Sequence, residues 1–155
     1  MKAVIKVKTR GAHCCPHIID NGDWIDLCAR DSMNLAKGHY TKIPLGVSIE
    51  LPPGYEAILA SRSSLYGKTG LYNPGGIGVI DNSFKGDNDE WQLPVWTCRN
   101  YNLQKGERVA QFRLQLSQKA TLWQRIKWLF TSGVRIKCVS TLGNKNRGGF
   151  GSTGK

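Results

Sequence analysis

Residues 78–87 read Gly78-Val79-Ile80-Asp81-Asn82-Ser83-Phe84-Lys85-Gly86-Asp87. A short β-branched run is followed by a carboxylate and then by turn-forming residues, which is the pattern of a strand that ends in a tight turn. The common role of an aspartate in such a place is to cap the turn. The alternative is a general base that the strand end holds in position. Both roles are open for Asp81 from this stretch alone.

Similar short runs, alternating or β-branched, stand on both sides of this stretch, and many of the 18 glycines and 6 prolines separate them. We expect strands at Val4–Lys8, Thr41–Leu51, Tyr55–Ala60, Gly78–Ile80, Gln92–Cys98, Arg108–Leu116 and Val134–Val139. Short strands with turn signals between them predict an all-β domain of the sandwich, barrel or jelly-roll kind.

The length of 155 residues fits one domain with one modest core. No apolar run approaches the roughly 20 residues of a membrane helix, so no membrane contact is expected. Residues 1–8 alternate between polar and apolar side chains and predict a strand rather than a signal peptide. Five cysteines without a secretory signal indicate free thiols in a reducing cytosol. The segment His13-Cys14-Cys15-Pro16-His17 lacks the spacing of a zinc site.

The net charge of +11 is concentrated in the last third of the chain. Residues 1–100 hold 11 Lys/Arg and 10 Asp/Glu, whereas residues 101–155 hold 11 Lys/Arg and one acid, Glu107. This imbalance is typical of a protein that binds nucleic acid or polyphosphate, or of a solvated basic face.

Residues 121–130 predict a helix, because Leu122, Trp123, Ile126, Leu129 and Phe130 fall on one helical stripe. We expect this stripe to pack on the body of the protein; the alternative is a basic amphipathic surface for a partner or membrane.

Residues 143–155, rich in glycine, hydroxyls and cations, predict a mobile arm that closes over an anion, or else an ordinary flexible terminus. Phe150 favours the arm, because an aromatic ring in a glycine run can stack on a base.

Further stretches contain residues that are candidates for binding phosphate or a cation, or for a buried ion pair. Arg62, Ser63 and Ser64 follow a predicted strand and are natural phosphate donors. Asp26 is flanked by apolar residues and therefore needs a hydrogen-bonding or cationic partner. Residues 87–91 form an acidic loop that is expected to be solvated or to bind a cation. No P-loop and no GxSxG motif is present.

Taken in order, these stretches resemble the five motifs of the trimeric dUTPase family. They are Asp26 in Asp-Leu-Cys-Ala, Arg62-Ser63-Ser64, residues 78–87, residues 106–111 and residues 148–154. Together they span residues 22–154, nearly the whole chain.

The resemblance implies an all-β, jelly-roll-like (β-clip) subunit that forms a homotrimer with active sites at the subunit interfaces. It implies a β domain at residues 1–142, with residues 121–133 as a short amphipathic helical insertion, and a flexible C-terminal arm at 143–155. It also implies Mg²⁺-dependent hydrolysis of dUTP to dUMP and pyrophosphate, in the cytoplasm of a bacterium or of a phage's host. Because the implied substrate is a nucleotide, the protein is not expected to require a nucleic acid partner.

The resemblance also implies roles for individual residues. Asp81 would be the catalytic base, and Asp26 would act on Mg²⁺ indirectly through water. The substrate-binding residues would be Arg62, Ser63, Ser64, Gly78, Phe84, Arg108, Gln111, Lys145, Arg147, Phe150, Ser152 and Thr153.

The chain departs from the family pattern at three places. Phe84 stands where the family usually has tyrosine, and Gly75 where it often has asparagine. The usual arm arginine is replaced by Lys145, while Arg147 lies closer to Phe150, so either residue is a candidate for the γ-phosphate.

Two alternatives to a dUTPase are considered. A dCTP deaminase of the same fold needs a glutamate that residues 93–100 do not contain. A non-catalytic, dUTPase-like module would bind a nucleotide, a nucleic acid or a regulatory protein without turnover.

Overall fold

The computed structural model describes residues 1–152, and most of their regular secondary structure is β-strand. The strands are β1 (Ala3–Thr9), β2 (His17–Ile18), β3 (Ile25–Cys28), β4 (Met33–Leu35), β5 (Tyr40–Pro44), β6 (Val47–Glu50), β7 (Tyr55–Ser61), β8 (Leu71–Tyr72), β9 (Ile77–Ile80), β10 (Gln92–Thr97), β11 (Tyr101–Leu103), β12 (Arg108–Leu116) and β13 (Val134–Cys138). The helices are α1 (Leu65–Thr69) and α2 (Leu122–Leu129), with a 3-10 turn η1 at Ala12–Cys14. The expected all-β class is confirmed.

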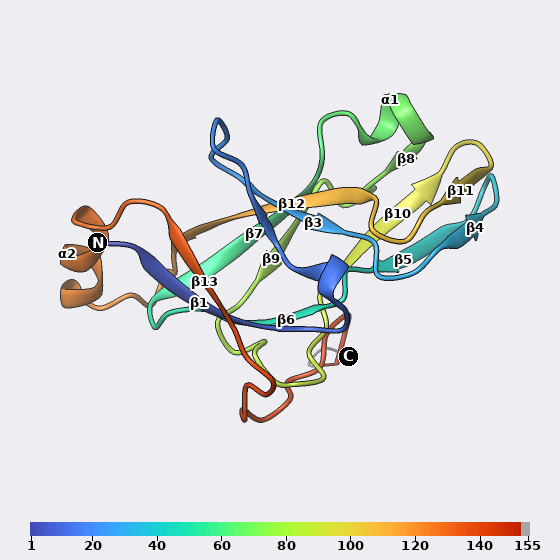
Figure 1. The fold of residues 1–155 in the computed structure, drawn as a ribbon. Helices are drawn as coiled ribbons and strands as arrows, with labels where there is room; N and C mark the ends of the chain where they lie inside the picture. The colour runs from blue at the N-terminus through green and yellow to red at the C-terminus, as the bar shows by residue number, and fades with distance from the viewer. Residues whose placement is uncertain (153–155) are drawn as a thin grey trace.

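The strands form four sheets, in the orders β2-β3-β12-β7-β9, β13-β1-β6, β5-β10-β8 and β11-β4. The five-stranded sheet and the β13-β1-β6 sheet form two layers at one end of the molecule (Figure 1). Helix α2 lies beside the N-terminus, at the end opposite to β4 and β11 (Figure 1). Because β9 pairs only with β7, the stretch that ends at Asp81 runs along a sheet edge among the described residues.

Strand alternation builds the core. In β1, Ala3, Ile5 and Val7 are buried, whereas Val4, between Ala3 and Ile5, is exposed. Trp91 and Phe112 meet edge to face in the same core, with ring centroids 5.1 Å apart. Removing a buried ring of this size typically destabilises a protein by about 3–5 kcal/mol.

Each of the seven expected strand regions contains strand, but one prediction was wrong in detail. The stretch Thr41–Leu51 is two strands, β5 and β6, with a break at Leu45-Gly46. Gly46 has φ 68°, and a Cβ there would collide with the Cys14 side chain. β3 was not predicted because all four of its residues are buried, which removes the alternation on which the strand signal depends.

The predicted helix is present as α2, but the prediction of its packing face was wrong. Leu122, Trp123, Leu129 and Phe130 are 70–78% exposed. Trp128, which lies outside the expected stripe, packs on Tyr55 with ring centroids 5.3 Å apart. A capping box between Thr121 and Gln124 fixes the start of the helix. The helix therefore docks through the opposite face and leaves its apolar stripe outward.

Within residues 1–152, none of the helices has the length and apolar character required to cross a bilayer.

Candidate active site

Asp81 directly follows β9 and is fixed by its own turn. Its Oδ1 accepts a hydrogen bond from the Ser83 backbone N–H at 2.8 Å, so the turn-capping role is present. The hydrogen bonds from the Ser83 backbone and side chain lower the pKa of Asp81, burial opposes this, and the charges of Arg147 and Lys119 add to the lowering. The carboxylate is therefore ionised at neutral pH and can accept a proton.

Asn82 anchors this turn to the body of the protein, a contact that sequence reasoning missed. Its Nδ2 donates to the carbonyl oxygens of Pro52 at 2.8 Å and Tyr55 at 3.0 Å. The Tyr55 ring also packs on Trp128 of α2, so this helix docks on the segment that holds the Asp81 turn. Lys119, just before α2, lines a second cavity together with Asp81.

A pocket of about 240 Å³ lies beside Asp81. Gly78, Asp81 and Phe84 line it from β9 and its turn, and Trp91 and Pro94 line it from the following loop and β10. Arg147, Gly149 and Phe150 reach it from the C-terminal segment. The structure thus brings residues of the third and fifth motifs together around one cavity.

The C-terminal segment crosses this pocket closely. Lys42 Nζ lies 4.1 Å from the Phe150 ring centroid, a cation–π contact. A Cβ on Gly149 would come within 3.2 Å of the Phe84 ring, so the two segments are in contact. Arg147 lines the pocket, whereas Lys145 is exposed and not among its lining residues. Ser152 is exposed, and Thr153 lies outside the described residues.

A second cluster forms around Asp26 on β3. This carboxylate is 1% exposed, and its Oδ2 lies 3.1 Å from Arg62 Nε and 3.2 Å from Arg108 Nη1. Gln111 pairs in register with Asp26 and donates from Nε2 to the Ser61 carbonyl oxygen at 3.2 Å. The buried acid thus has the cationic partners that its apolar context required.

Two hydroxyls stand beside this cluster. Ser63 and Ser64 are exposed in the turn between β7 and α1, and the Ser64 side chain makes no capping hydrogen bond. Two guanidiniums around one carboxylate leave a net positive charge, and with these hydroxyls the cluster suits an anion.

The two clusters lie far apart in one chain. Ile80 pairs with Ala57, which sets Asp81 opposite Glu56 at the start of β7. Arg62 follows the other end of β7, six residues beyond Glu56. At about 3.4 Å per residue this separation is roughly 20 Å. The structure therefore does not bring Arg62, Arg108 and Gln111 to the Asp81 pocket of the same chain.

Most of residues 87–91 contact the rest of the protein, and only Asn88 is exposed, so the expectation of a solvated loop was wrong. Trp91 is 1% and Asp89 2% exposed. Arg30 Nη1 donates to both carboxylate oxygens of Glu90, at 3.0 and 2.7 Å. The partners of this loop come from distant segments, which no local sequence signal indicates.

Within residues 1–152, no three His, Cys, Asp or Glu side chains gather as a metal cage. A site without such a cage is still compatible with Mg²⁺. This ion commonly keeps several waters and binds through substrate phosphates with only one or two carboxylates.

A model of the dUTPase family matches residues 24–127. The SPbeta prophage-derived deoxyuridine 5'-triphosphate nucleotidohydrolase YosS of Bacillus subtilis (strain 168) is 41% identical over 136 residues, covering 88% of this chain and 87% of that protein. The fold is shared with the dUTPase from Streptococcus mutans, with a TM-score of 0.65 and 23% identity over 73% of this chain and 93% of that one.

A mutant dUTPase from phage phi11 of S. aureus, described with the coordination of a structural Mg(II) ion, has a TM-score of 0.65 at 17% identity. That match covers 76% of this chain and 94% of the phage protein. The fold thus defines a dUTPase-like β subunit. Together with the family model and the relative in Bacillus subtilis, it establishes that the chain belongs to the dUTPase family.

Proposed function

We propose that this protein hydrolyses dUTP to dUMP and pyrophosphate, with Asp81 as the general base for water that attacks the α-phosphorus. The observation that carries this proposal is the position of Asp81, which Ser83 holds at the edge of the pocket that Arg147 and Phe150 also line. A general base must lie within hydrogen-bond reach of the water that it deprotonates. The family membership and the substrate named for the Bacillus subtilis relative support the same reaction.

The pocket suits the nucleoside part of this substrate. The backbone around Gly78 would read the uracil edge, and the Phe84 ring would stack against the deoxyribose. Phe150 would cover the uracil from the arm, with Arg147, Lys145, Ser152 and Thr153 as the groups that close on the phosphates. Closure by these residues would exclude bulk water from the reaction.

We further propose that the active site is completed by a second copy of the chain, within a homotrimer. The support is the separation of roughly 20 Å between Asp81 and Arg62, estimated from the strand rise. A second copy would place its Arg62, Ser63, Ser64, Arg108 and Gln111 on the triphosphate bound beside Asp81. Ile77 and Val79 on the β9 edge are 55% and 62% exposed, and such an interface would cover them.

Mg²⁺ would be held by substrate phosphates and water, with Asp26 acting through a bound water. The metal would neutralise phosphate charge when bound. Both ion pairs of Asp26 use Oδ2, so Oδ1 remains to orient such a water. Arg62 and Arg108 would supply positive charge to the phosphates in addition to the metal.

The pocket argues against deamination of dCTP. Pro94 lines it on β10, where the deaminase base is expected, and Glu90 is engaged by Arg30 and by the Gly46 backbone N–H at 3.0 Å. A nucleotide substrate also accounts for Arg62 and Arg108 without any nucleic acid.

The test is to mix the protein with dUTP or dCTP and Mg²⁺ and to measure pyrophosphate and ammonia. Pyrophosphate from dUTP is expected, and Asp81→Asn should bind dUTP with turnover reduced at least ~1,000-fold, because the base is lost. Ammonia from dCTP, or dUTP binding without hydrolysis by the wild type, would overturn the proposal. Trimer formation is checked separately by light scattering.

A further inference from the structure

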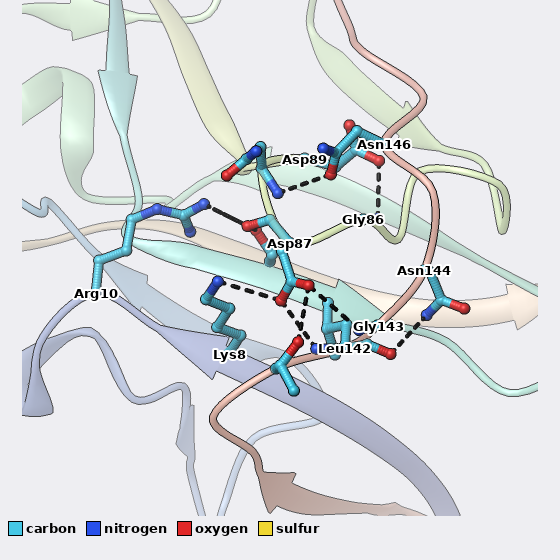
Figure 2. A network of polar contacts seen from close by, with 12 residues as sticks. Lys8, Arg10, Gly86, Asp87, Asp89, Leu142, Gly143, Asn144 and Asn146 are labelled. Atoms are coloured by element: carbon cyan, nitrogen blue, oxygen red, sulfur yellow. Dashed lines mark hydrogen bonds and ion pairs between the residues drawn. The ribbon is translucent and has the colours of Figure 1, made fainter.

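Residues 86–89 and residues 141–148 are joined by a dense set of hydrogen bonds (Figure 2). The first segment follows the Asp81 turn, and the second leads to the arm residues Arg147 and Phe150. The two segments are separated by more than fifty residues of sequence. Their contact therefore fixes where the arm starts to cross the pocket.

Asp89 is the centre of this contact. Its carboxylate accepts the backbone N–H of Arg147 at 2.8 Å, of Gly148 at 2.9 Å and of Gly86 at 2.8 Å. Burial by itself would raise the pKa of Asp89, but these backbone hydrogen bonds bring it below its ordinary value. One nearly buried, ionised side chain thus binds the arm on one side and the pocket loop on the other.

Asp87 holds the upstream part of the same segment. Its carboxylate accepts the backbone N–H of Leu142 at 2.9 Å and of Gly143 at 3.2 Å, and the Thr141 hydroxyl at 2.9 Å. Lys8 Nζ lies 3.1 Å from Oδ1 of this carboxylate, the oxygen that also accepts the Leu142 N–H. The arm segment is therefore attached at two points about five residues apart.

Gly86 gives an independent sign that residues 141–148 are held closely against the loop of residues 86–89. A Cβ at Gly86 would lie 2.5 Å from Asn146 Cα and 2.8 Å from Asn146 N, distances that real side chains do not adopt. Asn146 Oδ1 in turn accepts the Asn88 backbone N–H at 2.9 Å. The absence of a side chain at Gly86 permits this close approach of two backbones.

We propose that Asp89 is a positioning residue for the nucleotide reaction: it seats the arm, with Asp87 as its upstream anchor, so that Arg147 and Phe150 stand at the Asp81 pocket. Asp89 touches no reacting atom and acts through the two arm residues. The kinetic part of this proposal rests on the proposed dUTP hydrolysis. The seating itself is independent of any turnover.

The seating is measured first, without substrate. Trypsin can cut after Lys145 and after Arg147, and both bonds lie in the seated segment. We expect Asp89→Ala and Gly86→Ala to be cut at these bonds at least ~10-fold faster than the wild type. Asp89→Ala removes the acceptor of three backbone N–H groups, and Gly86→Ala prevents the close approach of the two backbones. Gly86→Ala leaves both carboxylates in place. Gly67→Ala is the matched control, since a Cβ there meets nothing within 4 Å.

The kinetic readout separates seating from general damage. Both variants should raise the KM for dUTP ~10-fold or more with a smaller loss in kcat, because the arm still closes when substrate is saturating. Asp89→Asn keeps one acceptor oxygen for Arg147 and Gly148 and should recover part of the KM. Each variant should keep the wild-type thermal midpoint within a few degrees.

The outcomes distinguish this proposal from the one on function. Wild-type trypsin rates and KM in both Asp89→Ala and Gly86→Ala overturn the seating proposal, even if dUTP is hydrolysed. Faster cleavage in a protein that hydrolyses no dUTP supports the seating and overturns only the proposed reaction. A large fall in thermal midpoint for Asp89→Ala alone, with Gly86→Ala unchanged in cleavage, makes Asp89 a structural residue and also overturns the proposal.

Discussion

Asp26 on β3 and Arg108 on β12 form an ion pair of 3.2 Å, in which the carboxylate is 1% exposed and the guanidinium reaches the surface. Arg62 shares the same carboxylate oxygen at 3.1 Å. One buried acid on a central strand thus sets the direction of two surface cations. With two guanidiniums on one carboxylate, the cluster keeps a net positive charge near the surface.

Asp26→Asn should therefore impair both stability and substrate binding. The amide keeps the shape but loses two charge-assisted contacts, which corresponds to about 1–3 kcal/mol of unfolding free energy. We also expect kcat/KM for dUTP to fall ~10-fold or more, because Arg62 and Arg108 lose their fixed direction. Urea unfolding and steady-state kinetics check the two effects. Asp23→Asn is the control, since Asp23 is exposed and meets Arg113 only at 3.9 Å; equal losses in both variants would contradict this role for Asp26.

Phe84 provides a test of the ring that replaces the usual tyrosine of the family. Phe84→Ala should lower kcat/KM about 10- to 100-fold, because burying a phenylalanine ring against the sugar contributes about 1.5–3 kcal/mol. Phe84→Tyr keeps the ring and should stay within ~3-fold of the wild type. If the alanine variant were as active as the tyrosine variant, stacking by this ring would be refuted.

Trp128 and Trp123 form a matched pair for the packing of α2. Trp128→Ala should destabilise the protein by about 2 kcal/mol, because the half-buried ring packs on Tyr55. Trp123 is 73% exposed, so Trp123→Ala should change the unfolding free energy by less than about 0.5 kcal/mol. Chemical unfolding measures both. A larger effect from Trp123 would mean that the outer stripe is covered in the protein in solution.

Tyr101 gives a pH-dependent prediction. Its hydroxyl donates to Glu107 Oε1 at 2.6 Å, and this hydrogen bond, with burial, raises the pKa of Tyr101 to about 12. An unperturbed tyrosine has a pKa of about 10. A pKa raised on folding adds stability that is complete below pH 10 and is lost as the pH rises toward 12. Ultraviolet titration should find a tyrosine that ionises near pH 12, and Tyr101→Phe should remove that step. A step that persists in this variant belongs to another group.

The sequence predicted best what local patterns encode. The alternation in β1 and the β-branched run before Asp81 predicted strands that the structure contains, and the turn after Asp81 followed from Asn82 and Ser83. Partners that lie far away in sequence were not predictable in this way. The loop that contains Asp87 and Asp89 has the composition of a solvated loop. Only the fold brings the arm backbone to these two carboxylates.

The outward stripe of α2 shows the same limit. A helical period identifies which residues share a face, but it does not say which face meets the body. Here the Tyr55 ring and the close approach of Gln124 to Gly54 select the face that carries Trp128. The separation of Asp81 from Arg62 likewise depends on the register of β7 with β9, which no single motif contains.

The parallel pairing of β1 with β13, which joins Ala3–Val7 to Val134–Cys138, bears on how the chain is made. During synthesis, β1 leaves the ribosome long before the strand that will cover its edge. Until then the edge of β1 presents unpaired backbone groups to other nascent chains. Contacts of such large sequence separation also slow folding. The last steps of folding are therefore expected to follow release of the C-terminal segment, and this is the interval in which the protein is most exposed to aggregation and to proteases.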